Sequence, residues 1–201
     1  MARDVVYVFA RAPRLGAVKR RLAREVGDRA ALRFYLATLR RLVRGLARDR
    51  RFRTVLAVTP DGGHIAGLPG VARVGQGQGD LGQRMARVLN LTRRGRAALI
   101  GSDIPAATAA DLRTCFRALG RADACFGPAA DGGFWLVGFG PRRAGRPFGR
   151  VRWSSTHTLA DTLANFAGRR VALLRTLQDV DTARDLRQGP PAEAPGRFVL
   201  R

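Results

Sequence analysis

The sequence predicts an α/β fold in a single domain, and three observations support this. Short apolar runs, typical of buried strands, recur along the chain at 5–9, 53–59, 97–100, 122–127 and 171–174. Longer stretches with helical periodicity lie between them, of which 28–48 is the clearest. The chain has 201 residues, 46% of them hydrophobic, which suffices for one core without disulfide bonds or structural metals. We expect this domain to cover residues 1–188, followed by a Pro-rich tail at 189–201.

The segment after the first strand has the features of a phosphate-binding loop. It contains Pro13 and Gly16 and leads into a helix whose first residues include Lys19, Arg20 and Arg21. A helix N-terminus offers free backbone N–H groups and a positive dipole end, to which cationic side chains add. Lys19 is the one lysine among 37 basic residues, which indicates a position that suits a compact ammonium better than a planar guanidinium. The alternative is a surface lysine that remained by chance.

A glycine-rich loop is predicted between a short strand at 71–74 and a helix that ends near Asn90. Four glycines within eight positions would let the backbone lie against a flat or anionic ligand. They are Gly75, Gly77, Gly79 and Gly82. Asp80 is placed to cap the helix that follows. A flexible connector is the alternative interpretation of this loop.

A carboxylate follows the strand at 97–100, in the sequence Gly101-Ser102-Asp103. In open α/β sheets ligands bind beyond the carboxyl ends of the strands, so Asp103 is expected where a metal ion, a ribose or a phosphate would be held. The other interpretation makes Asp103 the cap of the next turn, which Pro105 would open. A helix over about 108–119 is expected after it.

The turn Asp131-Gly132-Gly133 follows the strand at 122–127 and precedes Phe134 and Trp135. The Gly-Gly step would allow a substrate close to the backbone, with the two aromatic rings packed beneath or beside it. A plain β-hairpin turn explains the same pattern.

A second stretch near the C-terminus joins Trp153 to a helix that is expected to reach about Phe166. Ser154 or Ser155 is the expected N-cap of that helix. His157, in its first turn, could act as a base, although a histidine without a carboxylate partner in the sequence is more often structural.

Two carboxylates, Asp179 and Asp181, follow the strand at 171–174. Alternate positions of an extended segment face the same side, so both side chains are expected to point in one direction. Thr182 is expected to cap a short helix over 183–186.

Composition limits the classes of function. Cys115 and Cys125 lack metal-binding spacing, which favours reduced thiols and a cytoplasmic location. The apolar runs are too short for a membrane span or a signal peptide. A net charge of +22 would attract polyanions, but the basic residues are scattered and all but one of the 37 are arginine. A solvated basic surface is therefore favoured over a nucleic-acid interface.

Taken in order, these motifs resemble one family over about residues 5–187. The chain is similar to the small bacterial nucleotide-diphospho-sugar transferase-like proteins, also called selenodomain-associated transferases. Its layout also resembles the 2-phospholactate and molybdenum-cofactor guanylyltransferases. The motifs that carry the resemblance lie at 13–22, 79–85, 101–105, 127–138, 153–156 and 179–186. One difference is Arg20, a bulky cation where the family pattern usually has threonine.

The resemblance implies a GT-A type, Rossmann-like fold with a mixed, mostly parallel sheet and helices on both faces. It implies that Asp103, with Asp179 or Asp181 or both, holds Mg²⁺ or Mn²⁺ against a diphosphate. Asp103 and Asp131 are the expected catalytic residues, Asp131 as the general base if the reaction uses one. A retaining mechanism would not require a base. The expected nucleotide- and phosphate-binding residues are Arg11, Gly16, Lys19, Arg21, Gly79, Asp80 and Gly82. The expected substrate-binding residues are Gly132, Gly133, Trp135, Trp153 and Ser154.

The implied activity is metal-dependent transfer of a sugar from a nucleotide-diphospho-sugar to a small acceptor. One alternative is a nucleotidyltransferase that joins a nucleoside triphosphate to a phosphorylated small molecule, which pyrophosphate release would identify. Another is a basic nucleic-acid-binding protein on a degenerate transferase scaffold, for which a steep salt dependence of binding would be diagnostic.

Overall fold

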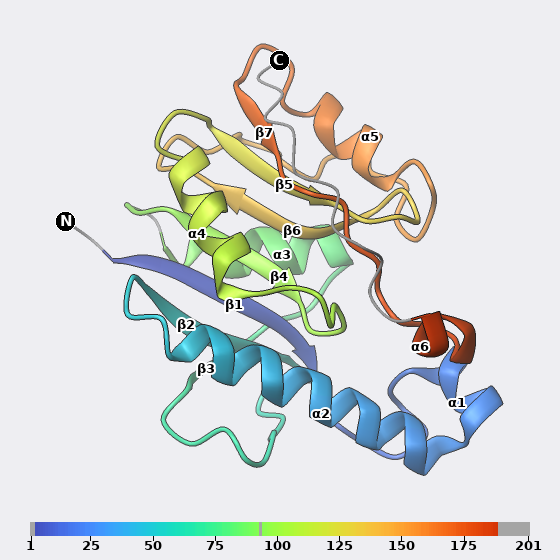
Figure 1. The fold of residues 1–201 in the computed structure, drawn as a ribbon. Helices are drawn as coiled ribbons and strands as arrows, with labels where there is room; N and C mark the ends of the chain where they lie inside the picture. The colour runs from blue at the N-terminus through green and yellow to red at the C-terminus, as the bar shows by residue number, and fades with distance from the viewer. Residues whose placement is uncertain (1–2, 93, 189–201) are drawn as a thin grey trace.

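The structure is a computed structural model that describes residues 3–92 and 94–188. One seven-stranded sheet lies between two layers of helices (Figure 1). The strands are β1 (Asp4–Arg11), β2 (Phe52–Thr59), β3 (Ala72–Gly75), β4 (Ala97–Gly101), β5 (Ala124–Pro128), β6 (Phe134–Phe139) and β7 (Val171–Leu173). The helices are α1 (Arg20–Val26), α2 (Asp28–Ala47), α3 (Leu81–Asn90), α4 (Ala109–Ala118), α5 (Thr158–Ala164) and α6 (Ala183–Gln188). The predicted tail at 189–201 lies outside the described residues.

The strand order is β3-β2-β1-β4-β6-β5-β7. Parallel pairing joins β1 to β2 and β4, and also joins β2 to β3 and β5 to β7. The hairpin strand β6 is antiparallel to both of its neighbours, β4 and β5. Six strands therefore run in one direction, and their carboxyl ends meet at one edge of the sheet. The predicted mixed, mostly parallel α/β fold is confirmed.

Each face of the sheet has its own hydrophobic core, because neighbouring residues of a strand point to opposite faces. Val6 and Val8 of β1 lie in the cluster that α2 and α4 cover, whereas Tyr7 lies in the cluster that α3 covers. The amphipathic α2 contributes buried Leu39, Leu42, Val43 and Leu46 to the first cluster. Figure 1 shows α2 and α4 on the near side of the sheet and α3 on the far side.

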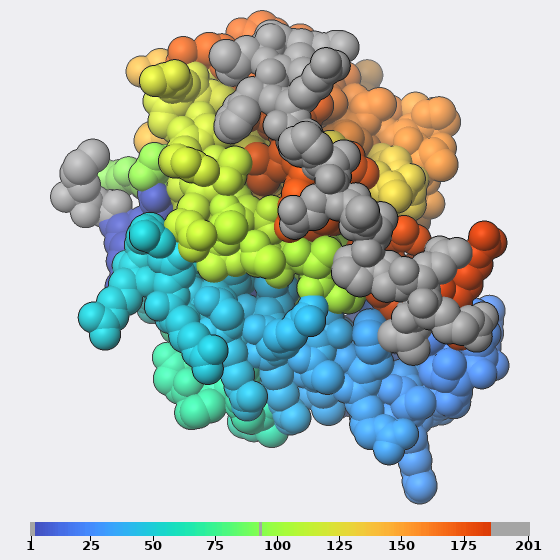
Figure 2. Space-filling view, viewed as in Figure 1, coloured from blue at the N-terminus to red at the C-terminus, as the bar shows by residue number. Residues whose placement is uncertain are grey.

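Two helices from opposite ends of the chain lie side by side. Leu22 of α1, Ala31 of α2 and Ala183 of α6 form a small separate hydrophobic cluster. The space-filling view shows the C-terminal segment, in red, beside the N-terminal segment, in blue (Figure 2). Because α6 packs against α1, the segment that follows β7 lies next to the loop that follows β1.

Most predicted helix ends agree with the structure, with one exception. Asp80 caps α3 in a capping box with Gln83, and Thr182 accepts a hydrogen bond from the N–H of Asp185 at the start of α6. The prediction that Ser154 or Ser155 caps α5 is wrong. Ser155 instead forms a turn before the helix, where its hydroxyl donates to the Arg152 carbonyl oxygen, and His157 occupies the N-cap position. None of the described helices is long and apolar enough to cross a membrane.

Candidate functional site

A cleft of about 760 Å³ opens beyond the carboxyl ends of the strands. In the sheet β1 lies between β2 and β4. The chain continues from β1 to β2 and β3 on one side, and then adds β4 on the other side of β1. A crevice forms where the strand order changes direction in this way, and it is the usual ligand site of open α/β sheets. The loops after β1, β4, β5 and β7 all contribute to the cleft.

Lys19 lies at the centre of the site. Its Nζ donates hydrogen bonds to Asp103 Oδ2 at 2.9 Å and to Asp181 Oδ1 at 2.7 Å. The lysine side chain is only 6% exposed. Burial alone lowers the pKa of Lys19, but the two carboxylates outweigh it and hold the pKa above its usual 10.5. Lys19 is therefore a buried ammonium at neutral pH, rather than the surface lysine that the sequence left as an alternative.

Three carboxylates converge on this lysine from two distant segments. Oxygen atoms of Asp103, Asp179 and Asp181 lie within 4.8 Å of one another. Within residues 3–92 and 94–188, this is the one group of three acidic, histidine or cysteine side chains close enough to share a metal ion. Burial, together with the negative charges of Asp181 and Asp103, raises the pKa of Asp179 to about 6.

This donor set fits a hard divalent cation. Mg²⁺ and Mn²⁺ prefer carboxylate oxygens, and three of them at one point of a cleft form a site to which phosphate oxygens could be added. The exposed Arg21 lies 3.5 Å from Asp181 and adds a further positive charge at the entrance. The predicted candidates Arg11, Lys19 and Arg21 all line the cleft.

The end of β1 is fixed by a tyrosine that the sequence did not single out. The hydroxyl of Tyr35 donates to the Arg11 carbonyl oxygen at 2.7 Å and accepts from the Arg11 N–H at 3.0 Å. Burial raises the pKa of Tyr35, so it stays a neutral donor. A tyrosine on the apolar face of the helix at 28–48 was the only signal of this role.

The glycine-rich loop is pinned rather than flexible. Gln76 is 1% exposed, and its Nε2 donates to the carbonyl oxygens of Ala10 and Ala57, at the ends of β1 and β2. Its Oε1 accepts from Arg84 at 2.9 Å. Because both the nitrogen and the oxygen of the Gln76 amide are hydrogen-bonded, the guanidinium of Arg84 is held in one position along the cleft wall. No local sequence pattern distinguishes Arg84 from the other arginines of the chain.

Several predicted glycines shape the cleft without lining it. Gly16, Gly79, Gly82 and Gly132 are absent from its wall, and Asp80 serves as the cap of α3. Gly82 leaves room for an aromatic ring, since a Cβ there would lie 2.7 Å from Trp153 Cζ2. Gly132 has φ +87°, and a Cβ would lie 2.3 Å from the Thr156 carbonyl oxygen. Gly82 therefore allows α3 to pack closely on Trp153, and Gly132 allows the turn at 131–133 to pack closely on the backbone of Thr156.

The expected acceptor side combines one exposed carboxylate with aromatic rings. Asp131 is exposed and its Oδ1 accepts from the Gly133 N–H at 2.9 Å, which closes the turn. Trp135 is only 3% exposed, and its indole N–H donates to the Arg175 carbonyl oxygen at 3.2 Å. Trp135 is therefore largely buried behind the surface of the cleft. Trp153 is half-buried and packs on Phe134 and Phe148 at the cleft wall.

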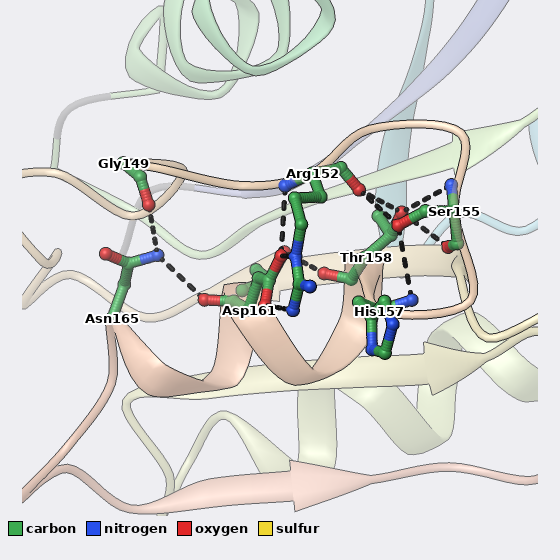
Figure 3. A network of polar contacts seen from close by, with 8 residues as sticks. Gly149, Arg152, Ser155, His157, Thr158, Asp161 and Asn165 are labelled. Carbon is green, nitrogen blue, oxygen red and sulfur yellow. Dashed lines mark hydrogen bonds and ion pairs between the residues drawn. The ribbon is translucent and has the colours of Figure 1, made fainter.

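A polar network holds the loop that carries Trp153 and Ser154 (Figure 3). Arg152 makes a two-pronged pair with Asp161 of α5, at 2.8 Å for both contacts. This guanidinium keeps the pKa of Asp161 well below its usual value. The Thr158 hydroxyl bonds the carbonyl oxygen of Arg152. His157 is exposed at the start of α5 and lies outside the cleft wall, so a role as base is not favoured by its position.

Comparisons with solved structures agree with this fold. A protein from Desulfovibrio desulfuricans G20, provisionally assigned as a nucleotide-diphospho-sugar transferase, superposes with a TM-score of 0.82 at 28% identity, over 90% of this chain and 84% of that one. Rv0371c from Mycobacterium tuberculosis H37Rv, solved with manganese, superposes with a TM-score of 0.52 at 18% identity, over 93% of this chain and 97% of that one. The synthetase for CMP-2-keto-3-deoxy-manno-octonic acid, solved with CTP, superposes with a TM-score of 0.54 at 10% identity, over 93% of this chain and 96% of that one. The last two show the shared fold alone.

No curated protein sequence matched this chain. A family model described as an uncharacterized protein conserved in bacteria, DUF2064, matches residues 38–155. That range contains β4, Asp103, the Asp131 turn and the loop with Trp153. By this match the chain belongs to the DUF2064 family, and its fold is that of nucleotide-diphospho-sugar transferases and nucleotidyltransferases.

Proposed function

We propose that residues 1–188 form a metal-dependent glycosyltransferase domain that binds a nucleotide-diphospho-sugar and transfers the sugar to a small acceptor. One observation carries the proposal, namely the meeting of Asp103, Asp179 and Asp181 with Lys19 at the carboxyl edge of the sheet. Keeping three half-buried carboxylates of like charge close together is costly, so such a cluster in a cleft points to a bound cation and a substrate.

The donor diphosphate would be bound by the two kinds of charge in the cleft. The three carboxylates would hold Mg²⁺ or Mn²⁺, which would neutralise the negative charge on the departing diphosphate. Lys19, Arg11 and Arg21 supply the remaining positive charge along the cleft wall.

Transfer breaks the bond between the anomeric carbon and a diphosphate oxygen and forms a bond from that carbon to an acceptor hydroxyl oxygen. The nucleoside diphosphate leaves with the bonding electron pair, and the hydroxyl proton must go to a base. Asp131 is our candidate, because it is exposed at the cleft and its Oδ1 is already held by the Gly133 N–H. We assign proton transfer to Oδ2. The half-buried Trp153, with Ser154 beside it, would contact the sugar or the acceptor.

Two relatives support the proposal, one for the substrate class and one for the metal. The protein with a TM-score of 0.82 has 28% identity and a provisional assignment as a nucleotide-diphospho-sugar transferase. Rv0371c, which shares the fold, was solved with manganese, which supports the choice of a divalent metal.

A nucleotidyltransferase is the second candidate, and the charge at the first loop favours it. Lys19, Arg20 and Arg21 are consecutive at the start of α1, with Arg11 on the same cleft wall. That density of positive charge suits a triphosphate better than a diphosphate ester. The relative solved with CTP shares the fold and binds a triphosphate.

Product analysis separates the two candidates. The protein is incubated with Mn²⁺, a panel of free and phosphorylated small-molecule acceptors, and either nucleotide-diphospho-sugars or nucleoside triphosphates, and products are measured by chromatography. Release of a nucleoside diphosphate from a nucleotide-diphospho-sugar supports the glycosyltransferase, and release of pyrophosphate from a triphosphate supports the nucleotidyltransferase. Asp103→Asn should abolish either reaction. Turnover that persists in this variant would exclude the carboxylate cluster as the site.

A further inference from the structure

We propose that Lys19 is a resident cation of the carboxylate cluster. In the nucleotide-free protein its ammonium holds the oxygens that a divalent metal would need, so metal binds tightly only together with a phosphate ligand that draws the ammonium away. This inference rests on the proposed function and deepens it, because it assigns Lys19 a role in the order and coupling of ligand binding.

The contacts of Lys19 coincide with the candidate metal ligands. Its Nζ is bonded to Asp103 Oδ2 and Asp181 Oδ1, so two of the three carboxylates already share one positive charge. A divalent ion bound to the same two carboxylates would lie within a few ångströms of the ammonium. Like charges at such a distance repel strongly in a partly buried site, where water screens them weakly.

The position of the ammonium is built into the backbone. Lys19 is the N-cap of α1 and has φ 48° and ψ 48°, a left-handed conformation that is uncommon for a residue other than glycine. Such backbone strain persists where the surrounding structure requires it, and it is concentrated at functional sites. Leu22 of α1 packs on Ala183 of α6, close in sequence to Asp181, which fixes the lysine and this carboxylate relative to each other.

A phosphate ligand changes this balance. An ammonium can exchange a carboxylate oxygen for a phosphate oxygen and keep its hydrogen bonds, so the loss of the carboxylate contact is compensated. The carboxylate oxygens are then available to the metal. Lys19 stays protonated throughout, so no proton release is required. By thermodynamic linkage, nucleotide should raise the affinity for metal by the same factor by which metal raises the affinity for nucleotide.

The first test uses Mn²⁺ alone, titrated by calorimetry into the nucleotide-free protein. We expect Lys19→Met to bind Mn²⁺ about tenfold more tightly than the wild type, or better. Arg21→Met is the matched control: it also removes one positive charge near Asp181, but that guanidinium is 78% exposed and 3.5 Å away. We expect its effect to be under about threefold. Equal affinities for Lys19→Met and wild type, or equal gains in both variants, would overturn the proposal.

The second test has a wild-type arm, which stands even if Lys19→Met fails to fold. Mn²⁺ affinity is measured with and without saturating ADP, CDP, GDP or UDP, after correction for Mn²⁺ bound to free nucleotide. We expect the diphosphate that binds to raise Mn²⁺ affinity about tenfold in the wild type and under about threefold in Lys19→Met. A wild type that binds Mn²⁺ equally well in both states contradicts the inference. If no diphosphate binds, the proposed function fails, while the first test still decides the role of Lys19.

Discussion

The ammonium of Lys19, in the loop after β1, lies 2.9 Å from the carboxylate of Asp103, in the loop after β4. The two residues are 84 positions apart in the chain, and they meet because β1 and β4 are paired in parallel at the centre of the sheet. The contact therefore joins the two halves of the sheet at the point where its strand order changes direction.

Replacing Gly132 by alanine should destabilise the protein through its backbone. A Cβ at φ +87° would overlap the Thr156 carbonyl oxygen, which is part of the backbone and cannot rotate away. We expect Gly132→Ala to lower the free energy of unfolding by about 2 kcal/mol or more. Gly45→Ala in α2, where nothing lies within 4 Å, is the control and should raise it by about 0.5–1 kcal/mol. Urea denaturation measures both, and equal effects of the two changes would be inconsistent with the structure.

Gly82→Ala tests whether Trp153 contributes to binding. The added methyl group would lie 2.7 Å from Trp153 Cζ2 and 2.9 Å from Phe148 Cβ, so the indole must move. We expect nucleotide-diphospho-sugar binding to weaken about tenfold, with a change in tryptophan fluorescence. In a Trp153→Ala background the same change should have little further effect. Additive losses in that double mutant would indicate that Gly82 acts through another contact.

Asp179→Asn should stabilise the protein at neutral pH. The folded-state pKa of Asp179 is about 6, above its usual 3.8, so the folded protein binds this proton more tightly than the unfolded chain does. The carboxyl group therefore reduces stability as pH rises from about 4 to about 6, and the penalty remains above that range. We expect Asp179→Asn to raise Tm by about 2–4 °C at pH 7, from roughly 1 kcal/mol after solvent screening.

The control for this prediction is the same pair of proteins at pH 4. There the wild-type carboxyl group is already protonated in the folded state, so the two melting temperatures should agree. A Tm difference that is independent of pH would show that the asparagine acts by some means other than removal of the charge.

The strands and the carboxylates of the site could be predicted from local sequence. Each buried strand is a short apolar run between turn residues, and Asp103 directly follows one of them. The rule that ligands bind at the carboxyl ends of strands then places Asp103 without any knowledge of its neighbours. The alternate spacing of Asp179 and Asp181 similarly indicated that the two side chains face the same side, and their oxygen atoms lie close together in the structure.

Contacts that depend on distant segments could not be predicted in this way. Lys19 was selected as a phosphate ligand, but its pairing with Asp103 and Asp181 follows from strand order and from the packing of α6 on α1. In the sequence, Gln76 is an ordinary polar loop residue. Its role depends on the pairing of β1 with β2, which places two backbone carbonyl oxygens next to its side chain. Trp135 lines the cleft, but its burial depends on Gly127, which leaves space for its ring.

The most direct test of the site is nucleotide binding that depends on both metal and Asp103. Calorimetric titrations use nucleoside diphosphates and triphosphates, in Mn²⁺ or in a chelator, with the wild type, Asp103→Asn and Asp123→Asn. Asp123 serves as the control because it lies before β5 at the opposite edge of the sheet, where asparagine can still accept from the Arg170 N–H. We predict that at least one nucleotide binds the wild type and Asp123→Asn alike, and that Asp103→Asn or chelation weakens it about tenfold or more. Binding that is unchanged by Asp103→Asn, or the absence of binding by every nucleotide, would contradict the assignment of this cleft.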